Sequence, residues 1–223
     1  MKRIALATFV LAAMLSPAFA ADIPPPTYMP PVRAPVSLPF NWGGLYGGVN
    51  LGWGFSDVDG IIGGGQIGYN WQINQLVFGI ETDIQGSGQD GSTTIVVGTS
   101  VLADKQALDW FGTFRGRVGY AAFDRWLPYF TVGLAYGTRS YSGVATGVPS
   151  GAYSASDTTV GWAIGVGVDY AFNQRWSARL EYLHISLDGS TNVYPLTGGA
   201  LTVPYGTLDN DIIRGAINYR ILP

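Results

Sequence analysis

Strict alternation of side-chain size over residues 160–171 constrains this chain more than any other feature. One face of the segment carries only large apolar side chains: Val160, Trp162, Ile164, Val166, Val168 and Tyr170. The opposite face carries small or charged positions: Gly161, Ala163, Gly165, Gly167, Asp169 and Ala171. A helix cannot separate these two sets, because its side chains repeat every 3.6 residues, whereas those of a strand alternate every two. The segment is therefore predicted to be a β-strand.

Similar alternation recurs along the chain between glycine-rich and polar breaks, which predicts eight strands. Their expected ranges are 44–55, 61–71, 76–85, 107–120, 126–138, 159–171, 175–187 and 208–221. Charged residues make up 12% of the chain, about half of the usual ~25%, yet beyond residue 20 no uncharged apolar run has the ~20 residues of a membrane-spanning helix. Apolar side chains distributed in this way are typical of a transmembrane β-barrel, although a soluble β-sandwich with its large face inward is the alternative.

The lengths of the connections favour the barrel. Those at 56–60, 71–76, 120–126 and 171–175 are short, whereas those at 86–106, 139–158 and 188–207 have about twenty residues each. Short turns at one end and long loops at the other are typical of transmembrane barrels. The sequence thus predicts an all-β, eight-stranded antiparallel transmembrane β-barrel with short periplasmic turns and longer extracellular loops, and an even strand number leaves both barrel termini in the periplasm.

The segment before the barrel has two parts. Residues 1–20 combine a basic start, an apolar run and the small-residue ending Ala18-Phe19-Ala20, which predicts a signal peptide cleaved after Ala20; a short membrane anchor is the alternative. Residues 21–40 hold seven of the thirteen prolines and are expected to form an extended periplasmic leader, with a ligand for a proline-binding module as the alternative. The transmembrane barrel is then expected over residues 41–223.

Aromatic residues gather near the predicted strand ends. An aromatic girdle is expected beside the short turns: Trp71, Tyr120, Trp126, Tyr170, Trp176 and Tyr219. A second band falls nearer the long connections: Trp53, Phe55, Trp110, Tyr136 and Trp162. Aromatic rings suit the two interfaces between lipid and water, so two such bands are expected of a membrane barrel; core aromatics of a sandwich are the alternative.

The same alternation turns eight charged residues towards the predicted lumen. They are four acids and four arginines: Glu81, Asp83, Arg115, Arg117, Asp169, Arg179, Glu181 and Arg214. An arginine facing lipid at mid-bilayer would cost roughly 2–4 kcal/mol, whereas one in a narrow lumen can pair with a carboxylate. Balanced numbers predict a lumen largely plugged by ion pairs, either as a fixed filling or as a gate with very small conductance.

Several kinds of chemistry are disfavoured. The chain has no cysteine and one histidine, so we expect no metal site and no cofactor. Without Lys2 and Arg3 there are 10 basic and 15 acidic residues, which argues against a nucleic-acid partner. His184 and Ser186 share a strand face in a pattern similar to lipid A deacylases, but no acid that would orient the histidine is evident, so we expect no catalytic residues.

Motifs across the chain resemble a known family. They are Phe40–Gly48, Gly64–Asn70, Arg115–Tyr120, Leu180–Tyr182 and Arg214–Arg220. With the proline-rich leader, these segments are similar to the alphaproteobacterial outer-membrane immunogenic proteins, which are porin-like barrels of the opacity and outer-membrane-protein-A type. The resemblance implies an abundant surface antigen of the Gram-negative cell outer membrane, with haem binding linked to some members. It implies no functional site residues.

The resemblance also implies partners. These are outer-membrane lipid, lipopolysaccharide and the outer-membrane assembly machinery, which in such barrels recognises a terminal aromatic where this chain has Ile221. We therefore expect a non-enzymatic outer-membrane barrel with a structural, porin-like envelope role. The alternatives are a surface-binding protein that takes haem, a host factor or an envelope component on its outer loops, and a lipid A deacylase that uses His184 and Ser186.

Overall fold

The computed structural model describes residues 40–97, 100–121 and 125–222, without the side chains of 95, 97, 100, 102 and 222. The chain divides into two compact units, Met1–Leu38 and Pro39–Pro223, and only the second contains described residues. The predicted signal peptide and all of the predicted leader except Phe40 lie outside the described residues. Within these residues, no helix has the length and apolar character needed to cross a membrane.

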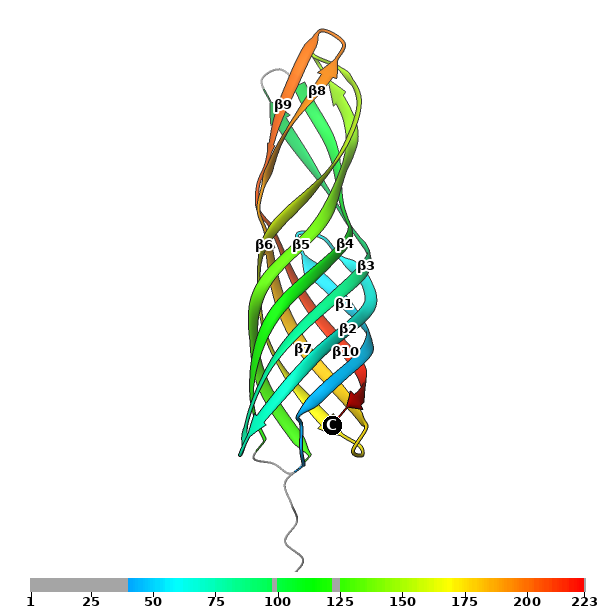
Figure 1. The fold of residues 1–223 in the computed structure, drawn as a ribbon. Coiled ribbons are helices and arrows are strands. Elements are labelled where there is room, and N and C mark those ends of the chain that lie inside the picture. The colour runs from blue at the N-terminus through cyan, green and yellow to red at the C-terminus, as the bar shows by residue number, and fades with distance from the viewer. Residues whose placement is uncertain (1–39, 98–99, 122–124, 223) are drawn as a thin grey trace, which may run out of the picture. The chain divides into compact units, whose positions relative to one another are not determined.

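Ten strands make up the described unit. They are β1 (Gly44–Ser56), β2 (Gly60–Ile73), β3 (Leu76–Val97), β4 (Ser100–Tyr120), β5 (Trp126–Thr146), β6 (Gly151–Ala171), β7 (Trp176–Leu187), β8 (Ser190–Leu196), β9 (Gly199–Tyr205) and β10 (Leu208–Leu222). Eight of them close a barrel in the order β1-β10-β7-β6-β5-β4-β3-β2, and β8 pairs with β9 in a separate hairpin (Figure 1). All neighbouring strands are antiparallel. The predicted eight-stranded antiparallel barrel is confirmed.

The outer ends of the strands differ from the prediction. Much of 86–106 and 139–158, expected to form irregular loops, continues β3, β4, β5 and β6, and most of 188–207 forms the β8–β9 hairpin. In Figure 1 these elements rise beyond the ends of β1, β2, β7 and β10, and we call this part the extension. The predicted strands were those with large apolar side chains on one face. In the extension the outward side chains include many serines and threonines, so these strands lack an apolar face and were not predicted.

Alternation places the apolar side chains of the barrel wall outside. On β1, for example, Val49, Leu51 and Trp53 are 57–68% exposed, whereas Tyr46 and Asn50, at inward positions of the same strand, are buried. Exposed large apolar side chains recur on every barrel strand, so they form a broad apolar surface around the barrel and are not isolated residues. A soluble protein cannot leave such a surface in water, so the soluble sandwich is excluded as an interpretation of this fold.

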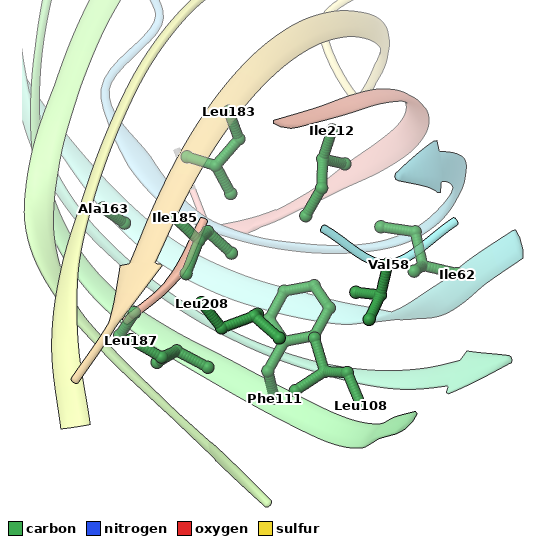
Figure 2. Packing of buried hydrophobic residues seen from close by; sticks show 11 residues of the cluster. Val58, Ile62, Leu108, Phe111, Ala163, Leu183, Ile185, Leu187, Leu208 and Ile212 are labelled. Carbon is green, nitrogen blue, oxygen red and sulfur yellow. The ribbon is translucent and has the colours of Figure 1, made fainter. Parts of the chain in front are cut away.

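The lumen is filled in layers along the barrel. Above the charged middle, on the side of the extension, apolar side chains from several strands meet across the lumen (Figure 2). They are Val58, Ile62, Leu108, Phe111, Ala135, Ala163, Leu183, Ile185, Leu187, Leu208 and Ile212, and we call them the apolar layer. At the opposite end, which carries the short turns, a second cluster contains Phe40, Trp42, Val77, Ala121, Leu127 and Ala171.

Candidate functional site: the filled lumen

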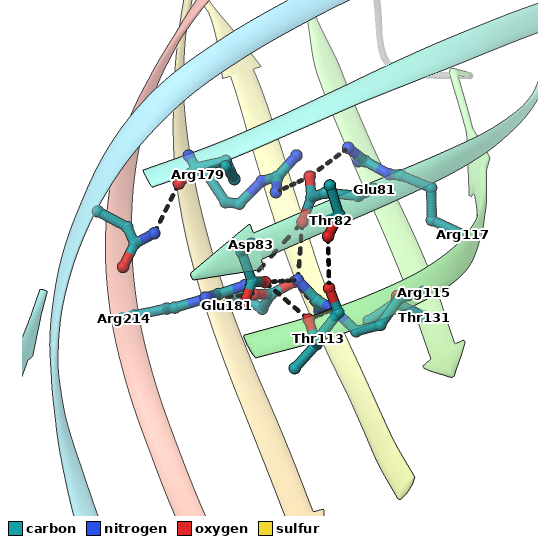
Figure 3. A network of polar contacts seen from close by, with 12 residues as sticks. Glu81, Thr82, Asp83, Thr113, Arg115, Arg117, Thr131, Arg179, Glu181 and Arg214 are labelled. Atoms are coloured by element: carbon teal, nitrogen blue, oxygen red, sulfur yellow. Dashed lines mark hydrogen bonds and ion pairs between the residues drawn. The ribbon is translucent and has the colours of Figure 1, made fainter. Parts of the chain in front are cut away.

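The eight charged residues predicted to face inward meet in the middle of the lumen. They extend from β3, β4, β6, β7 and β10, at the inward positions of each strand. Each is at most 5% exposed, so almost no part of these side chains contacts solvent. Figure 3 shows how most of them point towards one another from strands far apart in the sequence.

Arg115 is one centre of this network. Its Nη2 lies 2.7 Å from Glu81 Oε1 and 2.8 Å from Asp83 Oδ2, and its Nη1 lies 3.0 Å from Glu181 Oε1. Arg214 approaches two of the same acids, with Nη2 3.0 Å from Asp83 Oδ2 and Nε 2.6 Å from Glu181 Oε2. Asp83 and Glu181 are thus each shared by two arginines, a geometry that the planar guanidinium fork allows.

Asp169 is a second centre, nearer the short-turn end. Arg179 Nε lies 2.7 Å from Asp169 Oδ1, and Arg117 Nη2 lies 2.7 Å from Asp169 Oδ2. Arg179 Nη1 also reaches Glu81 Oε2 at 2.5 Å, so Glu81 joins the two centres. The structure therefore brings all eight predicted residues into one connected set of ion pairs.

Two tyrosines that sequence reasoning missed complete this set. Tyr46 donates a hydrogen bond to Glu81 Oε2 at 2.6 Å and accepts one from Arg117 Nη1 at 3.1 Å. Tyr129 donates to Glu181 Oε1 at 2.8 Å, and the Arg117 guanidinium lies 3.9 Å from the centre of its ring. Their positions on the inward face of β1 and β5 are a signal that could have identified them, because a phenol in a lumen needs a polar partner.

Buried apolar and aromatic side chains also pack inside the lumen towards both ends. The apolar layer crosses it on the extension side, with Phe111 and Leu183 fully buried. At the short-turn end, Phe40 and Trp42 pack edge to face with ring centres 4.8 Å apart, and Trp42 is 2% exposed. The cavity beside them has a volume of about 20 Å³, room for roughly one water molecule. Phe40, predicted as the last residue of the leader, is part of this buried cluster.

The aromatic residues of the predicted girdle lie on the outer wall. Trp71, Tyr120, Trp126 and Trp176 are 46–48% exposed, while Tyr170 and Tyr219 are half-buried. Two cross-strand pairs form there, with ring centres 4.6 Å apart for Trp126–Tyr170 and 4.9 Å apart for Trp176–Tyr219. In the predicted second band, Trp53, Phe55 and Trp162 are exposed.

The extension has a core of its own. Its buried side chains are Tyr141, Ala145, Tyr153, Tyr194, Leu201, Val203 and Tyr205. Asp104 lies among them, 1% exposed, and its Oδ1 accepts hydrogen bonds from Tyr153 at 2.8 Å and Tyr205 at 3.0 Å. Burial, followed by the hydrogen bond from Tyr153 to Asp104 and the charge of that carboxylate, raises the pKa of the Tyr153 phenol. The extension is therefore a packed structure of strands, whereas the sequence predicted long extracellular loops.

His184 has an acidic partner that sequence reasoning missed. Its Nδ1 lies 2.8 Å from Asp211 Oδ1, which also accepts a hydrogen bond from Tyr182 at 2.7 Å. Asp211 faces His184 directly in the β7–β10 pairing, which sequence spacing cannot reveal. Ser186 is buried, and in the part of the chain that the structure describes no hydrogen bond joins it to His184. A serine activated by this histidine is therefore not assembled.

A metal site is also not assembled among residues 40–97, 100–121 and 125–222, where no three histidine, aspartate or glutamate side chains gather suitably. The lumen carboxylates are instead satisfied by arginines. This arrangement can hold strands together and exclude water, because every charge is matched by an opposite charge nearby.

An eight-stranded antiparallel barrel with an apolar wall and a charged interior is the architecture of bacterial outer-membrane proteins. The family model described as "Outer membrane protein beta-barrel domain" matches residues 6–220, and the chain belongs to this family. Its location is thus the outer membrane, in a setting of lipid and lipopolysaccharide.

Individual relatives agree with this assignment. The chain is 35% identical over 247 residues to the 31 kDa outer-membrane immunogenic protein of Brucella melitensis, covering 99% of this chain and 100% of the relative. It is 34% identical over 179 residues to the 22 kDa outer membrane protein of Rhizobium leguminosarum, covering 78% and 76%. The crystal structure of a major outer membrane protein from Thermus thermophilus matches with a TM-score of 0.50 and 14% identity, over 79% of this chain and 99% of that one.

Proposed function

We propose that this protein is a non-enzymatic, closed barrel that anchors a rigid extension at the outer surface of the cell. One observation carries the proposal: the lumen is filled by a charge-matched network with an apolar layer above it and an aromatic closure below it. An eight-stranded barrel is only wide enough for its own side chains to fill.

Closure by both the apolar layer and the ion-pair network supports a structural role over a porin-like one. Ions would have to cross the apolar layer around Phe111, where a dry constriction opposes their passage. They would then have to separate pairs such as Arg115–Glu181, both of which are fully buried. Removing one partner of a buried pair costs about 3–5 kcal/mol, so we propose that the pairs stay closed at rest.

Conductance tests this proposal. The mature barrel, refolded and inserted into planar bilayers, is expected to give no steady current, while a trimeric porin added later to the same bilayer shows that open channels are detected. Heat-modifiability on a gel, measured on the same sample, verifies that the barrel is folded. A large and stable current through the folded protein would overturn the closed lumen.

The order of the N-terminal segments is part of the proposal. We propose that residues 1–20 are removed as a signal peptide and that residues 21–40 form a periplasmic leader. N-terminal sequencing of the protein from outer-membrane fractions is expected to begin at Ala21. A mature protein that still starts at Met1 would favour the alternative of a short membrane anchor.

Surface binding is the second candidate, and the packed extension favours it. A rigid display of strands offers a fixed surface to a host factor or an envelope component, whereas flexible loops would first have to be ordered. For haem, the only histidine offers little support, because His184 lies on the wall of the barrel and is joined to Asp211. A haem titration of the refolded barrel is expected to show no saturable Soret shift.

A further inference from the structure

Arg139 differs from the other arginines that are buried inside this protein. It lies on the inward face of β5, where the extension begins, and is 2% exposed. Each of the four arginines of the lumen network has a carboxylate oxygen within 3.0 Å. Among the described residues, by contrast, no carboxylate lies within the 4.0 Å of an ion pair from Arg139.

Only neutral oxygens contact the Arg139 guanidinium. Its Nη1 donates to the Gly206 carbonyl at 3.1 Å and to the Asp188 carbonyl at 3.5 Å, and its Nη2 donates to Gln106 Oε1 at 3.2 Å. Within the described structure, the buried Nε has no hydrogen-bond partner. Asp157 faces Arg139 in the β5–β6 pairing, but its Oδ2 accepts hydrogen bonds from Ser190 and Asn192 instead. A buried guanidinium with no carboxylate in direct contact is costly, so this site favours an anion that would pair with it.

A polar cavity lies directly beside this group. Its volume is about 380 Å³, within the range of small-molecule sites. The lining combines the Arg139 charge with hydroxyl, amide and backbone groups from the end of β1, the β1–β2 turn, β3, β4 and the β9–β10 link. They belong to Ser56, Asp57, Gly91, Ser92, Thr93, Gln106, Gly206 and Thr207. Hydroxyl and amide groups both donate and accept hydrogen bonds, which suits a ligand rich in hydroxyls.

We propose that this cavity binds a small anionic sugar, whose phosphate or carboxylate pairs with Arg139 and whose hydroxyls contact the polar lining. Asp57 is the one acid in the lining and opposes an anion there. One of its oxygens, Oδ2, is already occupied by the backbone N–H of Asp209 at 2.9 Å. Asp57 therefore lowers the affinity without removing the site.

Calorimetric titration of the folded, full-length mature barrel in neutral detergent tests the proposal, with glucose 6-phosphate as probe and glucose as its uncharged counterpart. We expect saturable binding of glucose 6-phosphate and much weaker binding of glucose. Arg139→Gln is expected to weaken glucose 6-phosphate roughly tenfold or more, the effect of losing a charge-assisted hydrogen bond. Arg139→Lys, which keeps the charge, is expected to retain part of the affinity.

Two further variants sharpen the result. Asp57→Asn removes the opposing charge and is expected to strengthen binding severalfold, whereas a general loss of folding could only weaken it. Lys105→Met removes an exposed cation of β4 and is expected to leave binding unchanged. Unchanged affinity in Arg139→Gln, or no saturable binding to the wild type, would overturn the proposal.

A final experiment distinguishes a sugar that is part of lipopolysaccharide from a free anionic sugar. Purified lipopolysaccharide, which carries phosphorylated sugars, is added before the glucose 6-phosphate titration. Competition would indicate a sugar attached to the membrane, and its absence would indicate a free solute; both results support an anionic sugar site. The outcome is independent of the closed lumen, because the cavity lies on the extension side of the apolar layer.

Discussion

Gly68 leaves the space that the Tyr46 side chain occupies inside the barrel. The two residues face each other in the β1–β2 pairing, and a Cβ at position 68 would lie 2.4 Å from the Tyr46 hydroxyl oxygen. Gly68→Ala is therefore expected to push Tyr46 away from Glu81 and to lower the free energy of unfolding by about 1–3 kcal/mol, as overpacking does. Urea unfolding in micelles measures the change.

Gly65→Ala is the matched control for this substitution. Gly65 lies on the same strand but faces the outer wall, and a Cβ there would meet its nearest atom, the Gly48 carbonyl oxygen, at an ordinary 3.5 Å. The free energy of unfolding of Gly65→Ala is expected to stay within ~0.5 kcal/mol of the wild-type value, as for most surface substitutions. Equal losses in the two variants would mean that the inward position of Gly68 is not the cause.

Removal of Arg115 should be among the most damaging single changes in the chain. Arg115→Met leaves Glu81, Asp83 and Glu181 with one cation fewer in a site where their side chains are at most 3% exposed. We expect a loss of about 3–5 kcal/mol in the free energy of unfolding. Arg125→Met, at an exposed arginine beside a short turn, provides the comparison; a similar loss there would contradict a special role for the buried network.

Alkaline pH should loosen the extension. The pKa values of Tyr153 and Tyr205 are raised above 10, in both cases first by burial. The next cause is the hydrogen bond to Asp104 for Tyr153 and the hydrogen bond with Tyr194 for Tyr205. Their contribution to stability is complete below the unfolded-state pKa near 10 and is lost as the pH rises from there through the raised folded-state values. As the pH is raised, tyrosinate absorbance should thus appear at a higher pH in the folded protein than in the protein unfolded in urea.

Tyr153→Phe should remove part of the tyrosinate absorbance that appears only at high pH in the folded protein. The protein unfolded in urea is the reference, since all of its tyrosines are exposed to solvent. If the folded wild type and the folded variant gave the same tyrosinate absorbance at high pH, Tyr153 would not be one of the phenols protected in the extension.

Two tryptophans near the short turns should respond differently to lipid. Trp71 is 48% exposed on the outer wall, whereas Trp42 is 2% exposed inside the mouth of the barrel. In vesicles of brominated lipid, Trp71→Phe is expected to reduce the quenchable part of the fluorescence, and Trp42→Phe is expected to leave it unchanged. The reverse result would contradict the proposal that Trp71 belongs to a girdle at the lipid interface.

The sequence by itself determined the strands and their two faces. Alternation is a local property with a period of two residues, so the large side chains of 160–171 and the inward position of Asp169 follow from the order of residues alone. For the same reason Arg115 and Glu181 could be assigned to the lumen. Polar alternation in the extension escaped this reasoning, because nothing local distinguishes a strand in water from a serine-rich loop.

Only the tertiary structure decided which residues meet. Glu81 and Arg179 are 98 positions apart, and they touch because the closed ring brings β3 and β7 to face each other across the lumen. The pairing register likewise set Asp211 beside His184. It also set Asp157 opposite Arg139, but the side chains of Ser190 and Asn192 take up the Asp157 carboxylate. Register and closure depend on contacts between strands distant in the chain, and these are set by packing across the whole barrel.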